Sequence, residues 1–137
     1  MDKLEQEVTM QEQIIVGFSK KEMEHIDLLV RTGMRRYVAA TLVYLSVIPE
    51  TTSREIERCA DLRQPEVSQA LKYLIGRDWV TRRVAVSKNK GRPMNIFSLV
   101  VPFREIVNTI EKEKRKEVSD KLVIIQKLRE SLGNIPG

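Results

Sequence analysis

The 137-residue chain contains only one cysteine and one histidine. One cysteine cannot form an internal disulfide, and the cysteine and histidine spacings that bind zinc are absent from the sequence. The same scarcity leaves no serine–histidine–aspartate or cysteine–histidine catalytic set, and none of the six glycines belongs to a phosphate-binding loop motif. We therefore expect a cytoplasmic protein that is not an enzyme and that uses no metal or other cofactor.

Long apolar runs are also missing from the sequence. The longest mainly apolar stretch, residues 37–48, is shorter than the roughly 20 residues needed to cross a bilayer. No basic start followed by an apolar run opens the chain, so we expect neither a membrane span nor a secretory signal. With 42% hydrophobic and 31% charged residues, the composition predicts a folded soluble protein that has one compact core with helical extensions.

Positive charge is concentrated in one part of the chain. The whole molecule carries a formal net charge of +5, whereas residues 63–92 contain eight basic and two acidic residues, a net of +6. Such a block is expected of a surface that neutralises phosphates. A solvated, charge-rich face would explain the block alone equally well.

Apolar periodicity predicts three helices in the first third of the chain. The first covers residues 2–15 and is amphipathic, and the second begins at Lys20 and ends near Gly33. The third reaches about Ile48 and is apolar over most of its circumference, so it should be the most buried element.

Two short helices are expected next. Thr52 and Glu55 have the spacing of a capping box at the start of a helix over about 53–61, whose Cys59 should be a small buried side chain. Pro65 is tolerated only in a first helical turn, so a new helix begins there. Its inward stripe comprises Val67, Ala70, Leu71, Leu74 and Ile75. Its opposite, polar face comprises Pro65, Ser68, Gln69, Lys72 and Tyr73.

After Asp78 the apolar period changes from 3.6 to 2. Two alternating runs, residues 80–87 and 95–100, are separated by a polar turn that contains Gly91, and this pattern predicts a β-hairpin. Trp79, at the junction of helix and strand, should be a core aromatic residue. A single helix is then predicted over residues 103–132. Its second half carries a coiled-coil-like seam of Val118, Leu122, Ile125, Leu128 and Leu132.

The order of these elements is that of a winged helix-turn-helix. Residues 62–74, with the spacing Q-P-x-V-S-x-x-L, resemble the recognition helix of ArsR-type regulators. Residues 90–93 (KGRP) followed by 96–99 (IFSL) are similar to the wing of ArsR, MarR and archaeal TrmB-like regulators. The resemblance implies a mainly α fold with a small β-hairpin (α+β). The expected parts are an N-terminal helical extension over 1–33, a DNA-binding domain over 34–102 and a C-terminal dimerisation helix over 103–137.

The same resemblance implies that the polar face of the second short helix and the hairpin contact DNA. The candidate DNA-binding residues are Arg63, Gln64, Pro65, Ser68, Gln69, Lys72, Tyr73, Arg82, Arg83, Lys88, Lys90 and Arg92. Arg63 stands where a small hydroxyl residue usually caps the helix, so we expect a phosphate contact there. Glu66 could complement the helix dipole or accept from cytosine N4, and the Gln69 amide is expected to pair with adenine through two hydrogen bonds.

We therefore expect a homodimer that regulates transcription by sequence-specific binding of double-stranded DNA, with the seam of the long helix as the dimer contact. The alternative is a winged-helix module for protein interactions within a larger nucleic-acid assembly. Such a module should expose apolar or acidic residues on the second short helix, whereas this helix exposes polar and basic ones. The sequence does not identify a small-molecule effector.

Overall fold

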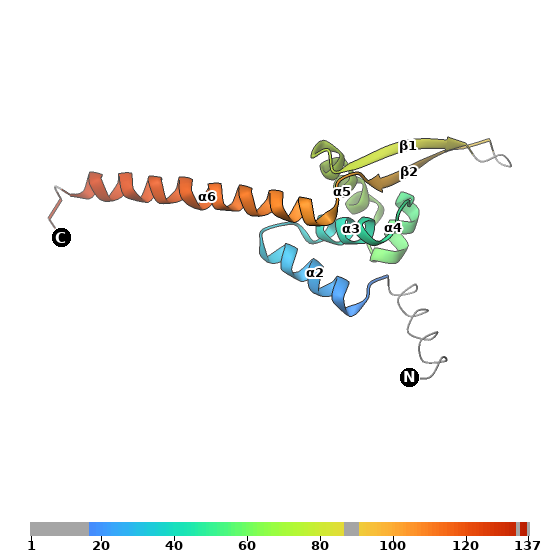
Figure 1. The fold of residues 1–137 in the computed structure, drawn as a ribbon, viewed down its shortest axis with the longest axis horizontal. Helices are drawn as coiled ribbons and strands as arrows, with labels where there is room; N and C mark the ends of the chain where they lie inside the picture. The colour runs from blue at the N-terminus through green and yellow to red at the C-terminus, as the bar shows by residue number, and fades with distance from the viewer. Residues whose placement is uncertain (1–16, 87–90, 134, 137) are drawn as a thin grey trace. The chain divides into compact units, whose positions relative to one another are not determined.

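The computed structural model describes residues 17–86, 91–133 and 135–136. The elements in chain order are α2 (Lys20–Arg31), α3 (Arg36–Val47), α4 (Ser53–Ala60), α5 (Gln64–Gly76), β1 (Val80–Val86), β2 (Pro93–Leu99) and α6 (Phe103–Leu132) (Figure 1). The helix predicted over residues 2–15 lies outside the described residues. The chain divides into two compact units, Met1–Val101 and Pro102–Gly137.

Helix α2 begins with a complete capping box that the sequence analysis overlooked. The Ser19 hydroxyl accepts the backbone N–H of Glu22, and the Glu22 carboxylate accepts the backbone N–H of Ser19, both at 3.2 Å. These two bonds satisfy N–H groups that have no partner within the helix. The helix buries Ile26 and Leu29 and gives way to Gly33, whose φ of 107° suits glycine.

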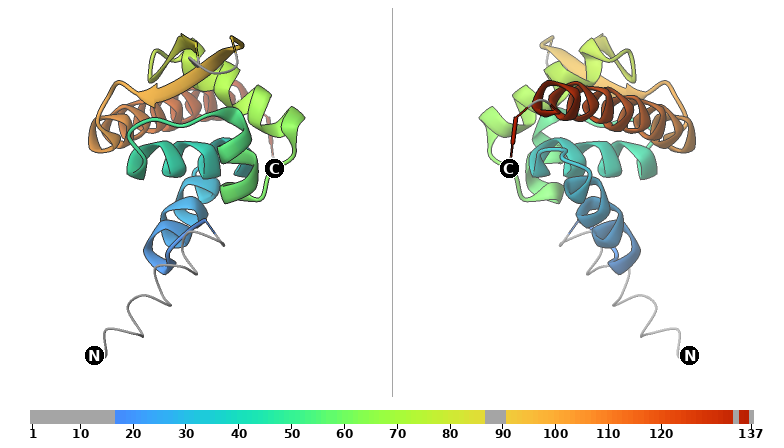
Figure 2. Two further views of the ribbon diagram at one scale, coloured as in Figure 1. Left: turned by 90° about the vertical axis from the view of Figure 1, so that its right-hand side faces the viewer. Right: turned by 90° about the vertical axis from the view of Figure 1, so that its left-hand side faces the viewer.

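Helix α3 is the centre of the first unit. Its residues 38–45 are all buried, which confirms that this helix is the most buried element. It contacts α2, α4, α5 and β2. Figures 1 and 2 show α3 between α2 on one side and α5 on the other. The apolar circumference of α3 therefore reflects packing on several sides.

Helix α4 is capped differently from the prediction. The Thr52 hydroxyl accepts the backbone N–H of Glu55 at 3.3 Å, as expected. The Glu55 carboxylate, however, accepts from the Thr51 hydroxyl at 3.0 Å, so the predicted reciprocal bond to the Thr52 backbone is wrong. Thr51 is only 2% exposed, and a buried hydroxyl without a partner is costly, which explains why Glu55 turns toward it.

Helix α5 follows after a short turn in which Asp61 takes the left-handed conformation, with φ of 52°. Pro65 lies in the first turn of α5, as predicted. Most of the inward stripe is buried, and Ile75 is half-buried. The helix packs this stripe against α3, α4 and β1, which leaves its polar face in solvent.

Strands β1 and β2 form an antiparallel hairpin, with Val80 opposite Leu99 and Val86 opposite Pro93. Pro93, which was expected in the turn, is the first residue of β2. Only the base of the hairpin is buried, where Phe97 exchanges two backbone hydrogen bonds with Thr51 at 2.8 and 3.0 Å. Val84 and Val86 are 60% and 65% exposed, so the outer part of the hairpin has no buried face.

Two predicted core positions have different outcomes. Trp79 is buried, which confirms the prediction. Cys59 is half-buried rather than buried. Burial and, to a lesser extent, a hydrogen bond with Cys59 raise the pKa of Tyr44 to about 12. Gly17 packs so closely on the backbone of Cys59 that a Cβ atom would collide with its carbonyl oxygen.

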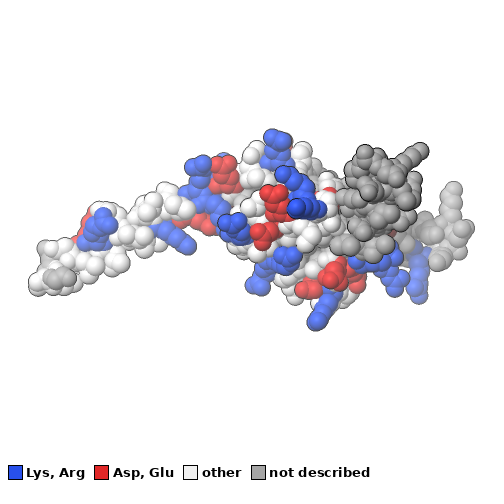
Figure 3. Space-filling view, turned by 90° about the horizontal axis from the view of Figure 1, so that it is seen from below, with Lys and Arg blue, Asp and Glu red and all other residues white. Residues whose placement is uncertain are grey.

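Helix α6 is one helix of 30 residues, as predicted. Its first turns bury Ile106 and Ile110, whereas every residue from 111 to 133 is exposed. The five seam residues, Val118, Leu122, Ile125, Leu128 and Leu132, are between 50% and 59% exposed. On the face seen in Figure 3, residues other than Lys, Arg, Asp and Glu cover most of the C-terminal part of α6.

The described residues thus form five helices and a two-stranded antiparallel hairpin, which confirms the predicted mainly α fold of a winged helix. The predicted limits of the extension and of the DNA-binding domain stay predictions. Within the described part of the chain, no helix is both long and apolar enough to span a membrane. The same residues contain no group of histidine, cysteine and acidic side chains suited to a metal ion.

Candidate nucleic-acid interface

The outer face of α5 presents every helix residue that the sequence analysis assigned to DNA. Arg63, Gln64, Pro65, Ser68, Gln69, Lys72 and Tyr73 are all exposed. Gln64 and Tyr73 are nine residues apart, which corresponds to about 14 Å along a helix. The structure therefore places these residues on the exposed side of α5 and at its N-cap.

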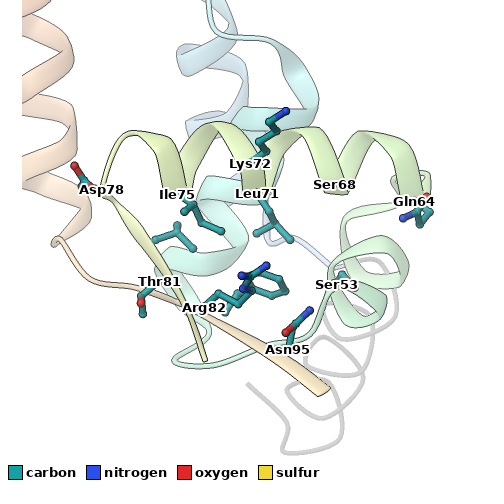
Figure 4. A pocket seen from close by; sticks show the side chains of 12 residues that line it. Ser53, Gln64, Ser68, Leu71, Lys72, Ile75, Asp78, Thr81, Arg82 and Asn95 are labelled. Atoms are coloured by element: carbon teal, nitrogen blue, oxygen red, sulfur yellow. The ribbon is translucent and has the colours of Figure 1, made fainter. Parts of the chain in front are cut away.

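A groove runs between α5 and the hairpin (Figure 4). It has a volume of about 690 Å³. Leu71 and Ile75 of α5 point toward the strands, while Lys72 points away from them. The groove thus has apolar side chains between its two walls and polar side chains at its edges. The polar residues that line it are Ser53, Gln64, Ser68, Lys72, Asp78, Thr81, Arg82 and Asn95.

Ser53, Thr81 and Asn95 were not among the predicted site residues. Asn95 lies directly opposite Val84 and diagonally opposite Arg82, so it shares the groove-facing side of the hairpin with Arg82. This assignment depends on the pairing register, which in turn depends on the conformation of the hairpin turn. The alternating pattern of a single strand does not show which residues of the other strand lie opposite it.

Arg82 and Arg83 do not act as a pair, although both were predicted to contact DNA. Of the two, Arg82 lines the groove and Arg83 does not. Arg83 donates to Glu50 through Nε at 3.3 Å and through Nη2 at 2.9 Å. Both side chains of this ion pair are about half exposed, at 54% and 53%. A DNA contact by Arg83 therefore has to compete with a bidentate bond to Glu50.

Gln69 has a partner that the sequence did not reveal. The hydroxyl of Tyr37, at the start of α3, donates to Gln69 Oε1 at 3.0 Å. The prediction treated the whole Gln69 amide as available for adenine, but its oxygen already accepts a hydrogen bond. Tyr37 was read only as part of an apolar run, and no local pattern relates two residues that are 32 positions apart.

Glu66 contributes to the start of α5. Its Oε1 atom accepts the backbone N–H of Arg63 at 2.9 Å, and the side chain is half-buried. Of the two roles that the sequence left open for Glu66, the structure shows the one at the helix terminus, where an acidic group complements the helix dipole. Because Glu66 makes this bond, the start of the helix does not depend on the Arg63 side chain, which is exposed.

Tyr73 is supported by the aromatic group at the end of α5. Its ring meets the ring of Trp79 edge-to-face, with centroids 6.5 Å apart and an interplanar angle of 82°. The Arg77 guanidinium lies 4.2 Å from the centroid of Trp79. Trp79 therefore holds one exposed aromatic residue and one cation at the same end of the helix.

The hairpin contributes one further candidate, Arg92. It is exposed and directly precedes β2. Gly91 before it has a φ of 60°, a left-handed conformation that glycine adopts without strain. The candidates Lys88 and Lys90 lie outside the described residues, so their contacts stay predictions.

Comparison with known proteins relates this architecture to a family of regulators. Residues 32–92 match the model of the MarR family. This match contains α3, α4, α5 and β1, and it confirms the predicted resemblance to MarR regulators. The separate likeness to ArsR regulators stays a prediction. The comparison with curated proteins found no match.

Two solved structures share the fold. The structure of TrmBL2, described as an archaeal chromatin protein with a novel mode of DNA binding, has a TM-score of 0.60 at 18% identity. The alignment covers 82% of this chain and 40% of TrmBL2, so the chain spans about two fifths of that protein. A second structure, described as a transcriptional regulator, has a TM-score of 0.50 at 17% identity and covers 85% of this chain and 78% of that one. This chain thus shares its winged-helix fold with these two proteins.

Proposed function

We propose that this protein is a homodimeric transcriptional regulator that binds double-stranded DNA in a sequence-specific manner. The observation that carries the proposal is the exposed polar face of α5 beside the groove and the hairpin. The major groove of DNA, about 12 Å wide, admits one α-helix, and a hairpin beside that helix can follow the neighbouring backbone. The fold shared with MarR regulators and the DNA binding described for TrmBL2 support this function.

The charges on this surface fit a nucleic acid better than a protein partner. Arg63, Lys72, Arg82 and Arg92 are exposed on α5 and the hairpin. Cations of this kind neutralise phosphates and so provide affinity that does not depend on sequence. The neutral side chains of Ser68 and Gln69 lie on the same exposed face, where they can distinguish bases through hydrogen bonds.

A second copy of the chain would complete the binding unit. The five seam residues of α6 are exposed within one chain, and soluble proteins rarely leave an apolar patch of this extent in water. A twofold contact through the seam would cover both copies and present two recognition helices to two half-sites. Sequence-specific affinity would then depend on the dimer, because each helix has only a few residues that can read bases.

Binding to DNA from upstream of the protein's own gene, measured by gel shift across a salt series, tests the proposal. Four described cations per subunit predict that log K falls with log salt with a slope of about −3.6 for one subunit and about −7 for a dimer. Lys72→Ala should flatten the slope, whereas Lys127→Ala, an equal charge change on α6, should not.

Sequence preference is the second part of this test. A regulator should bind one upstream segment far more tightly than unrelated DNA of the same length, by about a thousandfold or more. Equal affinity for all sequences, with the same salt slope, would contradict the proposal and indicate a protein that coats DNA. Affinity that is weak and independent of salt would favour the protein-interaction module instead.

A further inference from the structure

The hydrogen bond between Tyr37 and Gln69 connects the scaffold to the exposed face of α5. Tyr37 is the second residue of α3, and its side chain is half-buried. Gln69 lies in the middle of α5 and is exposed. The Tyr37 hydroxyl donates to Gln69 Oε1 at 3.0 Å. A residue of α3 thus orients a side chain on the exposed face of α5.

The two ends of a glutamine amide have opposite hydrogen-bonding properties. Its oxygen only accepts and its nitrogen only donates, and rotation by 180° exchanges the two ends. In this structure the Tyr37 hydroxyl donates to the oxygen, so the oxygen is the end of the amide that faces Tyr37. In the described part of the chain, the Gln69 nitrogen has no hydrogen-bond partner of its own, so it is the end of the amide that remains for a ligand.

These properties bear directly on which base Gln69 can read. Bidentate pairing with adenine requires the amide oxygen to accept from N6 while the nitrogen donates to N7, so both ends must face the base edge. A nitrogen acting alone requires only an acceptor. Adenine offers N7, guanine offers N7 and O6, and thymine offers O4, whereas cytosine offers only a donor in the major groove.

We propose that Tyr37 determines the base preference of Gln69, by withdrawing the amide oxygen and leaving Nε2 as the atom that reads the base. The position that Gln69 contacts then disfavours cytosine and does not favour adenine over guanine or thymine. Adenine gains no second bond there. This inference rests on the proposed function, and it replaces the adenine pairing that the sequence alone suggested.

Tyr37 acts here as a positioning residue, and its hydroxyl makes no contact with DNA in this scheme. The bond also restricts the rotation of a flexible side chain before DNA binds, which lowers the entropy lost on binding. Removal of the hydroxyl alone should therefore change the order of base preference and not merely the overall affinity.

The experiment begins by selecting binding sites from randomised duplex DNA with the full-length protein. The position read by Gln69 is the one whose preference disappears in Gln69→Ala. Affinities for duplexes that carry each of the four bases at this position are then measured by fluorescence anisotropy. The proteins compared are the unmodified chain, Tyr37→Phe, and Tyr37→Phe combined with Gln69→Ala.

Tyr37→Phe keeps the aromatic ring and removes only the hydroxyl, and thermal unfolding checks that the variant remains folded. We expect the affinity for adenine relative to guanine or thymine to rise about fivefold, which corresponds to about 1 kcal/mol for one hydrogen bond. The change should vanish in the Gln69→Ala background. Tyr44→Phe, which removes a buried hydroxyl from the same helix α3, should leave the order of the bases unchanged.

The outcomes separate this inference from the proposed function. If selection enriches a sequence but Tyr37→Phe preserves the base order, or if the unmodified protein already prefers adenine, the role of Tyr37 is refuted while the regulator remains supported. If selection enriches no sequence at all, the proposed function fails together with the inference. A change of base order that persists in Gln69→Ala would show that Tyr37 acts through another residue and would also overturn the inference.

Discussion

Replacing Leu122 and Ile125 of α6 with glutamate should convert the proposed dimer into a monomer that retains a folded first unit. Both side chains lie in the seam and are 59% and 50% exposed in the single chain. In a twofold contact, each substitution would place a carboxylate against the apolar seam of the partner. Burying such a charge without a counterion is strongly unfavourable.

The size of the effect follows from the exposure of the seam. Complete burial of a valine, leucine or isoleucine side chain stabilises by about 1.5–3 kcal/mol, so covering the exposed half of one contributes about 1 kcal/mol. The seam residues of two subunits together contribute about 10 kcal/mol. The double substitution removes about 4 kcal/mol, a thousandfold or more in Kd, before any charge repulsion.

Analytical ultracentrifugation at micromolar concentration measures this change directly. The unmodified protein should sediment with twice the chain mass of 15.9 kDa, and the double variant with the single mass. Val123→Glu is the matched control, because Val123 is 52% exposed but lies on the opposite side of the helix from the seam at 100° per residue. An unmodified protein that sediments as a monomer, or a double variant that stays dimeric, would refute the assignment of the seam.

Three further predictions concern the hairpin and the core. Arg92→Ala should flatten the salt slope of DNA binding by about one unit with little change in base preference, and an unchanged slope would exclude Arg92 from the interface. Glu50→Gln should release Arg83 and tighten DNA binding with a steeper salt slope, whereas Glu111→Gln, an equal charge change on α6, should have no such effect. Trp79→Ala should lower the free energy of unfolding by about 3–5 kcal/mol in urea denaturation, and a loss below about 1 kcal/mol would contradict its role in the core.

Much of the fold could be predicted because the relevant signals are local. The helix periodicities, Pro65 in the first turn of α5, and the change to a period of 2 after Asp78 all depend on residues within one or two turns of each other. The burial of α3 followed from its apolar circumference alone. Local capping was less certain, since Glu55 could satisfy either the Thr52 backbone or the Thr51 hydroxyl, and only the burial of Thr51 decides between them.

The site could be predicted as a set of exposed residues but not as a network of contacts. Tyr37 and Gln69 are 32 positions apart, and Arg83 and Glu50 are 33 positions apart. Each of these bonds depends on how two elements pack, and packing depends on many residues together. The sequence therefore predicted which side chains reach the surface, while their orientation and their competing partners needed the tertiary structure.

Under the proposed function, these contacts imply that recognition depends on residues that do not touch DNA. Tyr37 orients the Gln69 amide, Trp79 supports the ring of Tyr73, and Glu66 secures the first turn of α5. Each support limits the motion of a group that would otherwise lose entropy on binding. Substitutions of Tyr37 or Trp79 should consequently alter base preference or affinity while leaving the charge that attracts phosphates unchanged. A substitution of Glu66 also changes that charge. Changes to Lys72 or Arg92 should do the reverse, lowering affinity for all sequences alike.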